Sequence, residues 1–229
     1  MIHLIDVVKY YPGPDGPRRV IHPVSMSIPA HRQVAVLGYN GAGKTTFLKL
    51  LSGVEDPDEG RIIRSCRVSW PLGFQGGVSN DLTGSENAAF IARIYGADVD
   101  EVIAFVTDFA EIGDYMRMPV RTYSSGMRAR LSFALSMAID FDCYLVDEIT
   151  GVGDKTFQDK CRRTFAERAQ RSGLLFVSHN DQTVRQYCDM AIVIDEGCLI
   201  PFEDIDDARV YYRRVADRHY REQSKIGVN

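Results

Sequence analysis

The residues with the most specific chemical signature form the stretch GYNGAGKTT at positions 38–46. Its spacing, G-x-x-x-x-G-K-[ST], is that of a loop whose glycines allow backbone N–H groups to surround phosphate oxygens. Lys44 is placed to reach the β- and γ-phosphates of a nucleoside triphosphate, and the Thr45 hydroxyl is placed to bind Mg²⁺. We therefore predict nucleotide binding by Gly38, Asn40, Gly41, Gly43, Lys44, Thr45 and Thr46.

Two adjacent carboxylates end the strand-like run CYLVDE at 143–148. Asp147 is placed to hold Mg²⁺ through water, and Glu148 is placed to polarise a water molecule for attack on a phosphate. For this pair considered alone, a solvated strand end would also explain the charge. With a phosphate loop in the same chain, the pair indicates hydrolysis, in which Lys44 and Glu148 are catalytic.

Short β-branched runs alternate with helical patterns along most of the chain, which favours a mostly parallel sheet flanked by helices. The runs are VAVLG at 34–38, CYLVD at 143–147, LLFVS at 174–178 and AIVID at 191–195. The phosphate loop follows the first run and opens a helix pattern that ends at Gly53, a predicted C-cap. This is the strand–loop–helix setting that such a loop requires.

A segment from about 72 to 139 interrupts this alternation, and we predict a helical insertion in the α/β core. Its helix-like stretches are at 85–95, 100–112 and 126–139. Near the N-terminus, three prolines and two glycines at 10–19 predict an exposed hairpin loop between two short strands. A charged helical pattern begins near Asp206, and its last residues are expected to fray.

Composition limits the other functions that the chain can have. Among its 229 residues, 45% are hydrophobic and 25% charged, as in ordinary globular proteins. The net charge of -4 argues against a protein that mainly wraps nucleic acid. The five cysteines form no C-x-x-C pair and predict neither a disulfide framework nor a zinc site, which fits a reducing cytoplasm. The longest apolar runs are strand-sized, so a membrane role is expected to come through a partner.

Taken in order, these motifs resemble the nucleotide-binding subunit of ABC transporters over nearly the whole chain. The stretch YSSGMR at 123–128 is similar to the family signature LSGGQ, with Ser124 and Gly126 in the serine and second-glycine places. A serine hydroxyl at a helix N-terminus suits a terminal phosphate. The sequence departs from the signature at Ser125 and Met127, where the family usually has glycine and glutamine. A simple helix cap is the other interpretation of this stretch.

The resemblance implies roles for further residues. His179 matches the family's switch histidine, which hydrogen-bonds the γ-phosphate and orients water, and is therefore expected to be catalytic. Asp154 lies in a loop that is expected to cross a dimer interface, although GVGD stands where the family commonly has SALD. Gln75 lies roughly in the place of a glutamine that senses Mg²⁺ and water. Tyr11 resembles the aromatic residue that stacks on adenine, and Tyr10 is a close competitor.

The resemblance also implies a fold, cofactors and partners. The fold is a P-loop ABC ATPase core with a mostly parallel sheet, an N-terminal antiparallel β part and a helical insertion. ATP and Mg²⁺ are expected in a head-to-tail homodimer, where the signature of one copy meets the ATP on the phosphate loop of the other. A polytopic permease is the expected membrane partner, and no nucleic-acid partner is expected. The chain would then be peripheral to the cytoplasmic face of a bacterial inner membrane.

Three stretches narrow the resemblance to ATPases that export capsular polysaccharide from Gram-negative bacteria. They are SWPLGFQGGVSNDLTGSEN, MPVRTYSSGMRARLSFALSMAIDFD and VDEITGVGD. This resemblance covers residues 1 to about 215 and predicts the ATP-hydrolysing subunit of an exporter of capsular or related polysaccharide. An importer, a lipid or drug exporter and a soluble ABC-type ATPase are the alternatives. We expect one nucleotide-binding domain over 1–220, with a helical subdomain at about 76–140, and a tail at 221–229.

Overall fold

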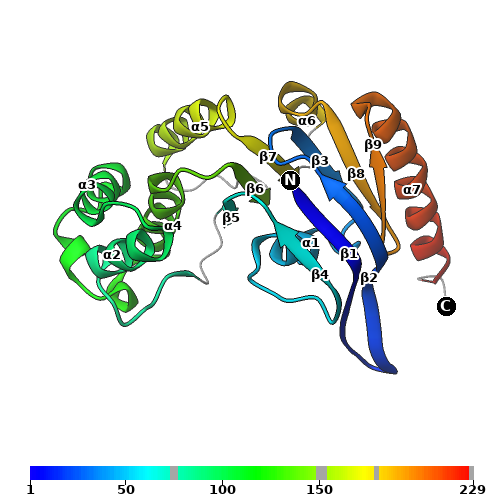
Figure 1. The fold of residues 1–229 in the computed structure, drawn as a ribbon, viewed down its shortest axis with the longest axis horizontal. Helices are drawn as coiled ribbons and strands as arrows, with labels where there is room; N and C mark the ends of the chain where they lie inside the picture. Colours follow the sequence, from blue (N-terminus) through cyan, green and yellow to red (C-terminus); the bar gives the residue numbers. More distant parts are fainter. Residues whose placement is uncertain (73–76, 148–153, 178–180, 227–229) are drawn as a thin grey trace. The chain divides into compact units, whose positions relative to one another are not determined.

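The computed structural model describes residues 1–72, 77–147, 154–177 and 181–226, with side chains in all of these except 181–183 and 222–226. Its elements are labelled in Figure 1. The strands are β1 (Ile2–Gly13), β2 (Gly16–Ile28), β3 (Gln33–Leu37), β4 (Glu59–Arg64), β5 (Val68–Leu72), β6 (Cys143–Asp147), β7 (Gly173–Val177), β8 (Met190–Asp195) and β9 (Cys198–Phe202). The helices are α1 (Lys44–Ser52), α2 (Gly84–Tyr95), α3 (Val99–Ala110), α4 (Ser125–Ala138), α5 (Lys155–Ala169), α6 (Asp181–Tyr187) and α7 (Ile205–Ile226), with short 3₁₀ helices η2 (Gly113–Arg117) and η3 (Val120–Thr122).

The chain divides into two compact units. The first, the core unit, consists of Met1–Pro71, Asp142–Glu148 and Ser172–Asn229, and holds the sheets with α1, α6 and α7. The second, the helical unit, consists of Leu72–Phe141 and Ile149–Arg171, and holds α2 to α5 with the 3₁₀ helices. The helical unit thus includes α5 in addition to the segment that the sequence singles out as an insertion.

The larger sheet of the core unit has the strand order β5-β6-β7-β3-β8-β9. β3 pairs in parallel with β7 and β8, β6 pairs in parallel with β7, and β9 is antiparallel to β8. In the middle, Val36 pairs with Val177 on one side and Ile192 on the other, and all three are buried. Asp147 pairs with Val177, so the carboxyl ends of β3, β6 and β7 lie at one edge of the sheet. The phosphate loop and Asp147, which the sequence predicts to bind phosphate and metal, stand at the ends of these strands or directly after them in the sequence.

Helix α1 brings an apolar face into the core. Its buried side chains are those of Phe47, Leu48, Leu50 and Leu51. They pack with buried residues of β1, β3 and β8. The helix ends at Gly53 in the left-handed conformation, as the sequence predicts. Arg64 of β4 donates to the carbonyl oxygens of Leu50 and Leu51 at 2.6 and 2.7 Å, which satisfies acceptors at the end of the helix.

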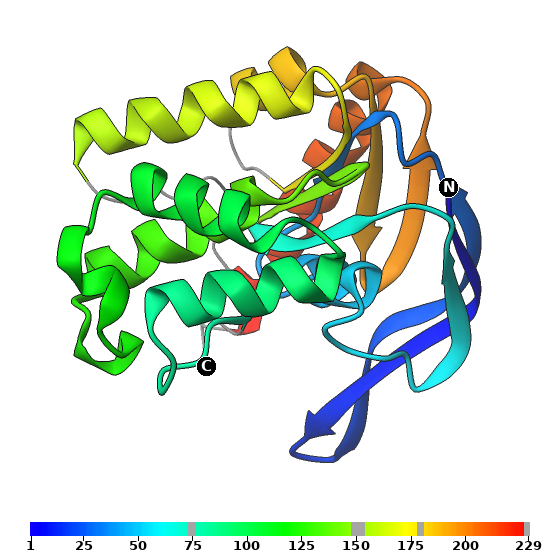
Figure 2. The same ribbon diagram turned by 60° about the vertical axis from the view of Figure 1, so that its left-hand side comes forward.

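The smaller sheet has the order β2-β1-β4, and it corrects one prediction. The proline-rich stretch was expected to be a loop, but β1 and β2 remain paired as far as Gly13 and Gly16. Figures 1 and 2 show them as a long blue hairpin. β4 pairs with β1 up to Val8, and the N–H of Tyr10 donates to Asp58; among the described residues no third strand pairs with the hairpin nearer its tip. Pro12 and Pro17 are tolerated there because an edge position needs no N–H donor.

Capping residues define where helices of the helical unit begin. These helices are drawn mainly in green in Figures 1 and 2. Thr83 accepts from the N–H of Glu86, and the Glu86 carboxylate accepts from the N–H of Thr83, a capping box that begins α2. Asp98 caps α3. The helices α2, α3 and α4 each begin one residue before the predicted start. Phe109 of α3 packs on Phe133 of α4, with ring centroids 5.9 Å apart.

Helix α7 packs along β8 and β9 (Figure 1). Ala208 and Val215 are its buried apolar contacts. The carboxylate of Asp195 at the end of β8 accepts from the Tyr211 hydroxyl at 3.3 Å and pairs with Arg218 at 2.6 Å. These contacts fasten the helix to the sheet. Among the helices described, none is long and apolar enough to cross a membrane.

Thiol labelling tests this packing. Burial raises the pKa of Cys143, Cys161 and Cys188 to about 12, so these thiols are both shielded and protonated near neutral pH. We expect an aromatic disulfide reagent to label at most Cys66 and Cys198 in the folded protein, and all five cysteines in guanidinium chloride. Peptide mass spectrometry locates the labels. Rapid native labelling of the three buried thiols would contradict the packing.

Candidate nucleotide-binding site

The predicted phosphate loop connects β3 to α1 within the core unit. Gly41 and Gly43 have φ angles of 84° and 108°, in the left-handed region that favours glycine. A Cβ atom on Gly43 would also lie 3.2 Å from the carbonyl oxygen of Val20. Gly43 is the N-cap of α1, and among the residues described no side chain caps this helix end. The first amides of α1 are therefore placed to bind an anion.

Lys44, the first residue of α1, folds back over the loop. Its ammonium group donates to the carbonyl oxygens of Gly38 and Tyr39 at 2.8 and 3.1 Å. Asn40 lies exposed in the loop between these groups and the helix. The positive charge of Lys44 and the first amides of α1 thus lie beside the same loop, as binding of a polyphosphate requires.

Thr45 and Asp147 meet although they are far apart in the sequence. The Thr45 hydroxyl donates to Asp147 Oδ2 at 2.8 Å. A hydroxyl and a carboxylate in contact fit Mg²⁺, which prefers oxygen ligands and takes the others from water and phosphate. With Val177 and most of the phosphate loop, these two residues line a cavity of about 300 Å³. The structure therefore brings the predicted metal-binding oxygens to the predicted phosphate site.

Tyr11 of β1 is linked to the same helix. Its hydroxyl donates to Glu55 and is hydrogen-bonded to the side chain of Thr46. Glu55 also accepts from Lys49 of α1 at 2.9 Å. Burial and then the hydrogen bond with Glu55 raise the pKa of Tyr11. Glu55 and Lys49 could not be predicted from the sequence as supports for Tyr11, because neither belongs to a motif.

Tyr10, the competing candidate, lies in a different environment. Its hydroxyl accepts from Arg19 and donates to Glu59, both at 3.1 Å. The guanidinium group of Arg19 also lies over its ring, 5.4 Å from the centroid. Neighbouring residues of a strand point to opposite faces, so the structure directs Tyr11 toward the phosphate loop and Tyr10 toward Arg19.

The predicted signature stretch begins α4 in the helical unit. Ser124 is the N-cap, and its hydroxyl accepts from the N–H of Met127 at 3.2 Å. Ser124, Ser125 and Gly126 are exposed. The helix-cap interpretation therefore holds for Ser124. It does not conflict with phosphate binding, because a hydroxyl that accepts one hydrogen bond still has its own proton to donate.

Asp154 of the predicted interface loop caps α5 and reaches the signature helix. Its carboxylate accepts from the N–H of Phe157 at 3.0 Å and from Arg130 of α4 at 2.8 Å. The guanidinium of Arg130 also lies over the Phe157 ring, 4.3 Å from the centroid. The backbone hydrogen bond from Phe157, and then the charge of Arg130, lower the pKa of Asp154. The pairing of Arg130 with Asp154 could not be predicted from the sequence, because no spacing rule connects the two residues.

Three predicted site residues, Gln75, Glu148 and His179, lie outside the described residues. Their roles stay predictions. Glu148 directly follows Asp147, and His179 is two residues after Val177, so both follow strands that end at the edge described above.

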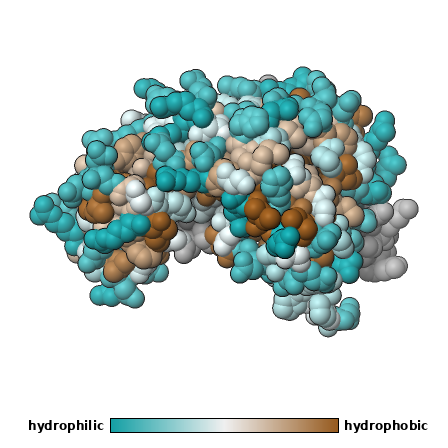
Figure 3. All heavy atoms as spheres, in the orientation of Figure 1, coloured by the Kyte–Doolittle hydropathy of each residue, from teal (hydrophilic) through white to brown (hydrophobic). Residues whose placement is uncertain are grey.

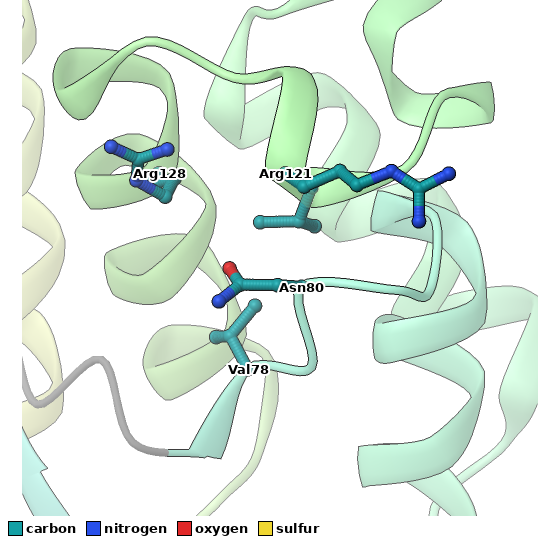
Figure 4. A pocket seen from close by; sticks show the side chains of 5 residues that line it. Val78, Asn80, Arg121 and Arg128 are labelled. Carbon is teal, nitrogen blue, oxygen red and sulfur yellow. The ribbon is translucent and has the colours of Figure 1, made fainter.

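The helical unit has a cavity of its own, of about 430 Å³ (Figure 4). It is lined by Val78, Asn80, Val120, Arg121 and Arg128. Arg128 donates to the Tyr123 carbonyl oxygen at 2.8 Å, which fixes it beside the start of α4. In Figure 4 the side chain of Arg121 extends away from Asn80 and Arg128, and it pairs with Asp81 at 3.1 Å. The cavity thus has a polar wall beside the signature stretch.

The family of the chain follows from its similarity to known proteins. Residues 21–151, more than half of the chain, match the family model described as ABC transporter. The chain belongs to the ABC transporter family. As a member of this family it is an ATPase, and ATP is its nucleotide. The resemblance based on the phosphate loop, the signature and their order is confirmed.

The chain is similar over nearly its whole length to three bacterial ATP-binding proteins, of which one is named for capsule polysaccharide export and one for polysialic acid transport. It is 46% identical to the capsule polysaccharide export ATP-binding protein CtrD of Neisseria meningitidis serogroup B, over 94% of the chain and 100% of that protein. It is 44% identical to the polysialic acid transport ATP-binding protein KpsT of Escherichia coli, over 92% and 97%. The ATP-binding protein BexA of Haemophilus influenzae is 43% identical, over 94% and 99%. These similarities confirm the narrower resemblance.

Solved structures support the fold. A dimeric ATP-binding cassette in a post-hydrolysis state, bound to ADP and phosphate, has a TM-score of 0.70 at 18% identity, over 90% of the chain and 99% of that structure. An ATP-binding subunit of an ABC transporter has a TM-score of 0.69 at 20% identity, over 98% and 99%. The predicted fold, an ABC ATPase core with a mostly parallel sheet, antiparallel strands and helices, is confirmed.

The hydrogen bonds around Glu55 predict a pH-dependent contribution to stability. Burial acts to raise the pKa of Glu55, but the hydrogen bonds from Tyr11 and Lys49 outweigh burial and lower it. A carboxylate of this kind stabilises the fold above its unfolded pKa of about 4.3, and the contribution is lost as pH falls through the folded value. We therefore expect Glu55→Gln to lower the free energy of unfolding by about 1 kcal/mol at neutral pH, and by less below about pH 4.

Urea unfolding at several pH values measures this difference. The matched control is Glu203→Gln, which removes a carboxylate that is 84% exposed and pairs with Arg32 at 3.5 Å. An exposed pair contributes little, so this variant is expected to be nearly as stable as the parent. A loss from Glu55→Gln that stays constant with pH would contradict the prediction.

Proposed function

We propose that this chain is the ATP-hydrolysing subunit of an exporter of capsular or related cell-surface polysaccharide, with a separate polytopic membrane subunit forming the path for the polysaccharide. The observation that carries this proposal is the identity of 42–46%, over nearly the whole chain, to proteins named for capsule polysaccharide export or polysialic acid transport. The ATPase activity follows from membership of the family, and the proposed substrate class is inferred from the names of these relatives.

In the proposed site, the loop amides and Lys44 bind the β- and γ-phosphates of ATP. Thr45 and Asp147 hold Mg²⁺, with Asp147 acting through water, and their contact at 2.8 Å supports this pairing. When bound, Mg²⁺ neutralises charge on the phosphates. Asn40 and Thr46 complete the nucleotide-binding loop, and both line the cavity beside Asp147.

Glu148 is proposed as the base that positions the attacking water, and Lys44 stabilises the transferring phosphoryl group. His179 is proposed to hydrogen-bond the γ-phosphate and help orient that water. Gln75 is proposed to sense both the metal and the water. The support for these roles is the place of each residue in the sequence motifs of the family.

Two copies are proposed to act head to tail, each closing over the ATP of the other. Ser124 and Gly126 then meet the γ-phosphate on the partner's loop, and their exposure at the start of α4 supports this. Asp154 is proposed to lie at the dimer interface, and its ion pair with Arg130 connects it to the signature helix. Contacts that exist while the γ-phosphate is present favour the closed dimer, and hydrolysis removes them.

We propose that residues 1–220 form one nucleotide-binding domain, that the helical subdomain at about 76–140 receives a short cytoplasmic helix of the membrane subunit, and that 221–229 form a tail. The docking surface runs from about Gln75 to Tyr95. The cavity in Figure 4 supports it, as do Phe90 and Ile94, which are 50% and 56% exposed and lie one helical turn apart on α2.

Figure 3 shows brown, hydrophobic residues reaching the surface over α2 and α3 among teal, polar ones. A mixed surface of this kind suits an amphipathic partner helix. The chain would thereby be held at the cytoplasmic face of a bacterial inner membrane through its partner.

The placement of Tyr11 beside Thr46 generates a test of adenine stacking. We expect Tyr11→Ala to raise the KM for ATP about tenfold, because stacking of a base on an aromatic ring is worth ~1–3 kcal/mol. Tyr11→Phe keeps the ring and is expected to stay close to the parent. Tyr10→Ala is the matched control, with little change expected. Initial-rate measurements decide, and a larger effect at Tyr10 would reverse the assignment.

Glu148→Gln tests the proposed function directly. This variant is expected to bind ATP, to hydrolyse it at least about 100-fold more slowly, and to accumulate as a dimer when ATP is present. Light scattering after size-exclusion chromatography measures the dimer. The tagged Glu148→Gln variant is then purified, in the presence of ATP, from detergent-solubilised native membranes. The co-purifying proteins are identified by mass spectrometry.

Recovery of a polytopic inner-membrane protein together with capsule export components supports the proposal. A solute-binding protein with its permease would indicate an importer, and exclusively soluble or nucleic-acid partners would indicate an ATPase outside transport. Lys44→Ala, which lacks the charge that binds phosphate, is the control and is expected to lose the ATP-dependent dimer. Hydrolysis by Glu148→Gln at the parent rate would contradict the catalytic role.

A further inference from the structure

Tyr39, the second residue of the phosphate loop, is held from outside the loop by the C-terminal helix. Its ring stacks on that of His219 in α7, with centroids 3.7 Å apart and planes inclined by 17°. Its hydroxyl accepts from the backbone N–H of Glu196, in the turn between β8 and β9. We propose that His219 is a positioning residue for nucleotide binding, which acts on the phosphate loop through Tyr39.

The backbone of Tyr39 carries the effect to the phosphate site. Its carbonyl oxygen accepts from the Lys44 ammonium group and from the N–H of Ala42, each at 3.1 Å. A shift of Tyr39 therefore moves an acceptor on which the position of the Lys44 charge depends. Lys44 in turn is the side chain placed to meet the β- and γ-phosphates.

Contacts with the core unit hold helix α7 in place near His219. Asp195, which is 8% exposed, pairs with Arg218 at 2.6 Å and accepts from Tyr211 at 3.3 Å. Val215, one turn before His219, is buried. The ring of His219 thus comes from a helix that is anchored to the end of β8. Tyr39 lies against the same sheet end, because its hydroxyl bonds to Glu196 directly after β8.

This contact is not part of the phosphate-loop motif. The position of Tyr39 is one of the unspecified positions in G-x-x-x-x-G-K-[ST], so the motif does not require an aromatic ring there. Fixing the loop before the nucleotide arrives reduces the conformational entropy that binding must overcome. The stack is therefore expected to increase affinity for nucleotide with little effect on the chemical step.

Substitution of His219 in the full chain tests the proposal. We expect His219→Leu, which fills space without a flat ring, to raise the KM for ATP and the Kd for ADP about threefold to tenfold. The kcat at saturating ATP and the Tm are expected to stay close to the parent. His219→Phe keeps a ring that can stack and is expected to restore the affinity. The matched control is Tyr220→Ala, which removes a ring that is 75% exposed on the same helix.

A double variant shows whether the effect passes through Tyr39. Tyr39→Leu is expected to weaken binding by itself, and His219→Leu is then expected to weaken it no further. Unchanged affinity in His219→Leu, an equal loss in Tyr220→Ala, a loss that His219→Phe does not restore, or independent addition of the two losses would each overturn the proposal. Calorimetric binding and steady-state rates suffice, so the outcome does not depend on which substance is transported.

Discussion

The structure depends on one helix end that must be open to a ligand while one face of the same helix is buried in the core. Helix α1 begins at a glycine in the left-handed region and has its apolar face in the core. A buried hydrophobic core holds the helix in place, so its first amides, which no side chain caps among the described residues, can stay open without loosening it. At the other end, Gly53 and Arg64 satisfy the last carbonyl groups. The core thus fixes the direction in which the phosphate loop faces.

The order of the strands brings the carboxylate of Asp147 to the phosphate loop. Asp147 reaches Thr45 because β6 pairs with β7 and β7 pairs with β3, which brings the end of β6 near the loop that follows β3. The core unit therefore carries the phosphate loop, Asp147 and Tyr11. The helical unit carries the exposed signature stretch and Asp154. A chain whose predicted nucleotide-binding residues are distributed over two units in this way is suited to the proposed arrangement, in which copies complete each other's sites.

The sequence predicted those features that are set by neighbouring residues. The phosphate loop, the C-cap at Gly53 and the three helices near 85, 100 and 126, predicted to within one residue of their starts, are local features, since each depends on a few consecutive residues. The extent of the β1–β2 hairpin was missed, because prolines and glycines suggested a loop while cross-strand pairing decided the outcome.

Contacts between distant residues could not be predicted either. Glu55 with Tyr11, Arg130 with Asp154, and Tyr39 with His219 each join residues that belong to different elements. Their meeting depends on packing of the elements and on no periodic pattern. Such contacts surround the predicted site residues, so the sequence yields candidate site residues without the side chains that support them.

The cation that Arg64 places at the carboxyl end of α1 has a consequence for the lifetime of the protein. The helix macrodipole is negative at that end and positive at the loop, so Arg64 compensates one pole and a bound nucleotide compensates the other. Because α1 is also a core element, a ligand at its start adds to the free energy of the whole fold. The protein without bound nucleotide would thus unfold more often, and be degraded sooner, than the protein with nucleotide in its loop.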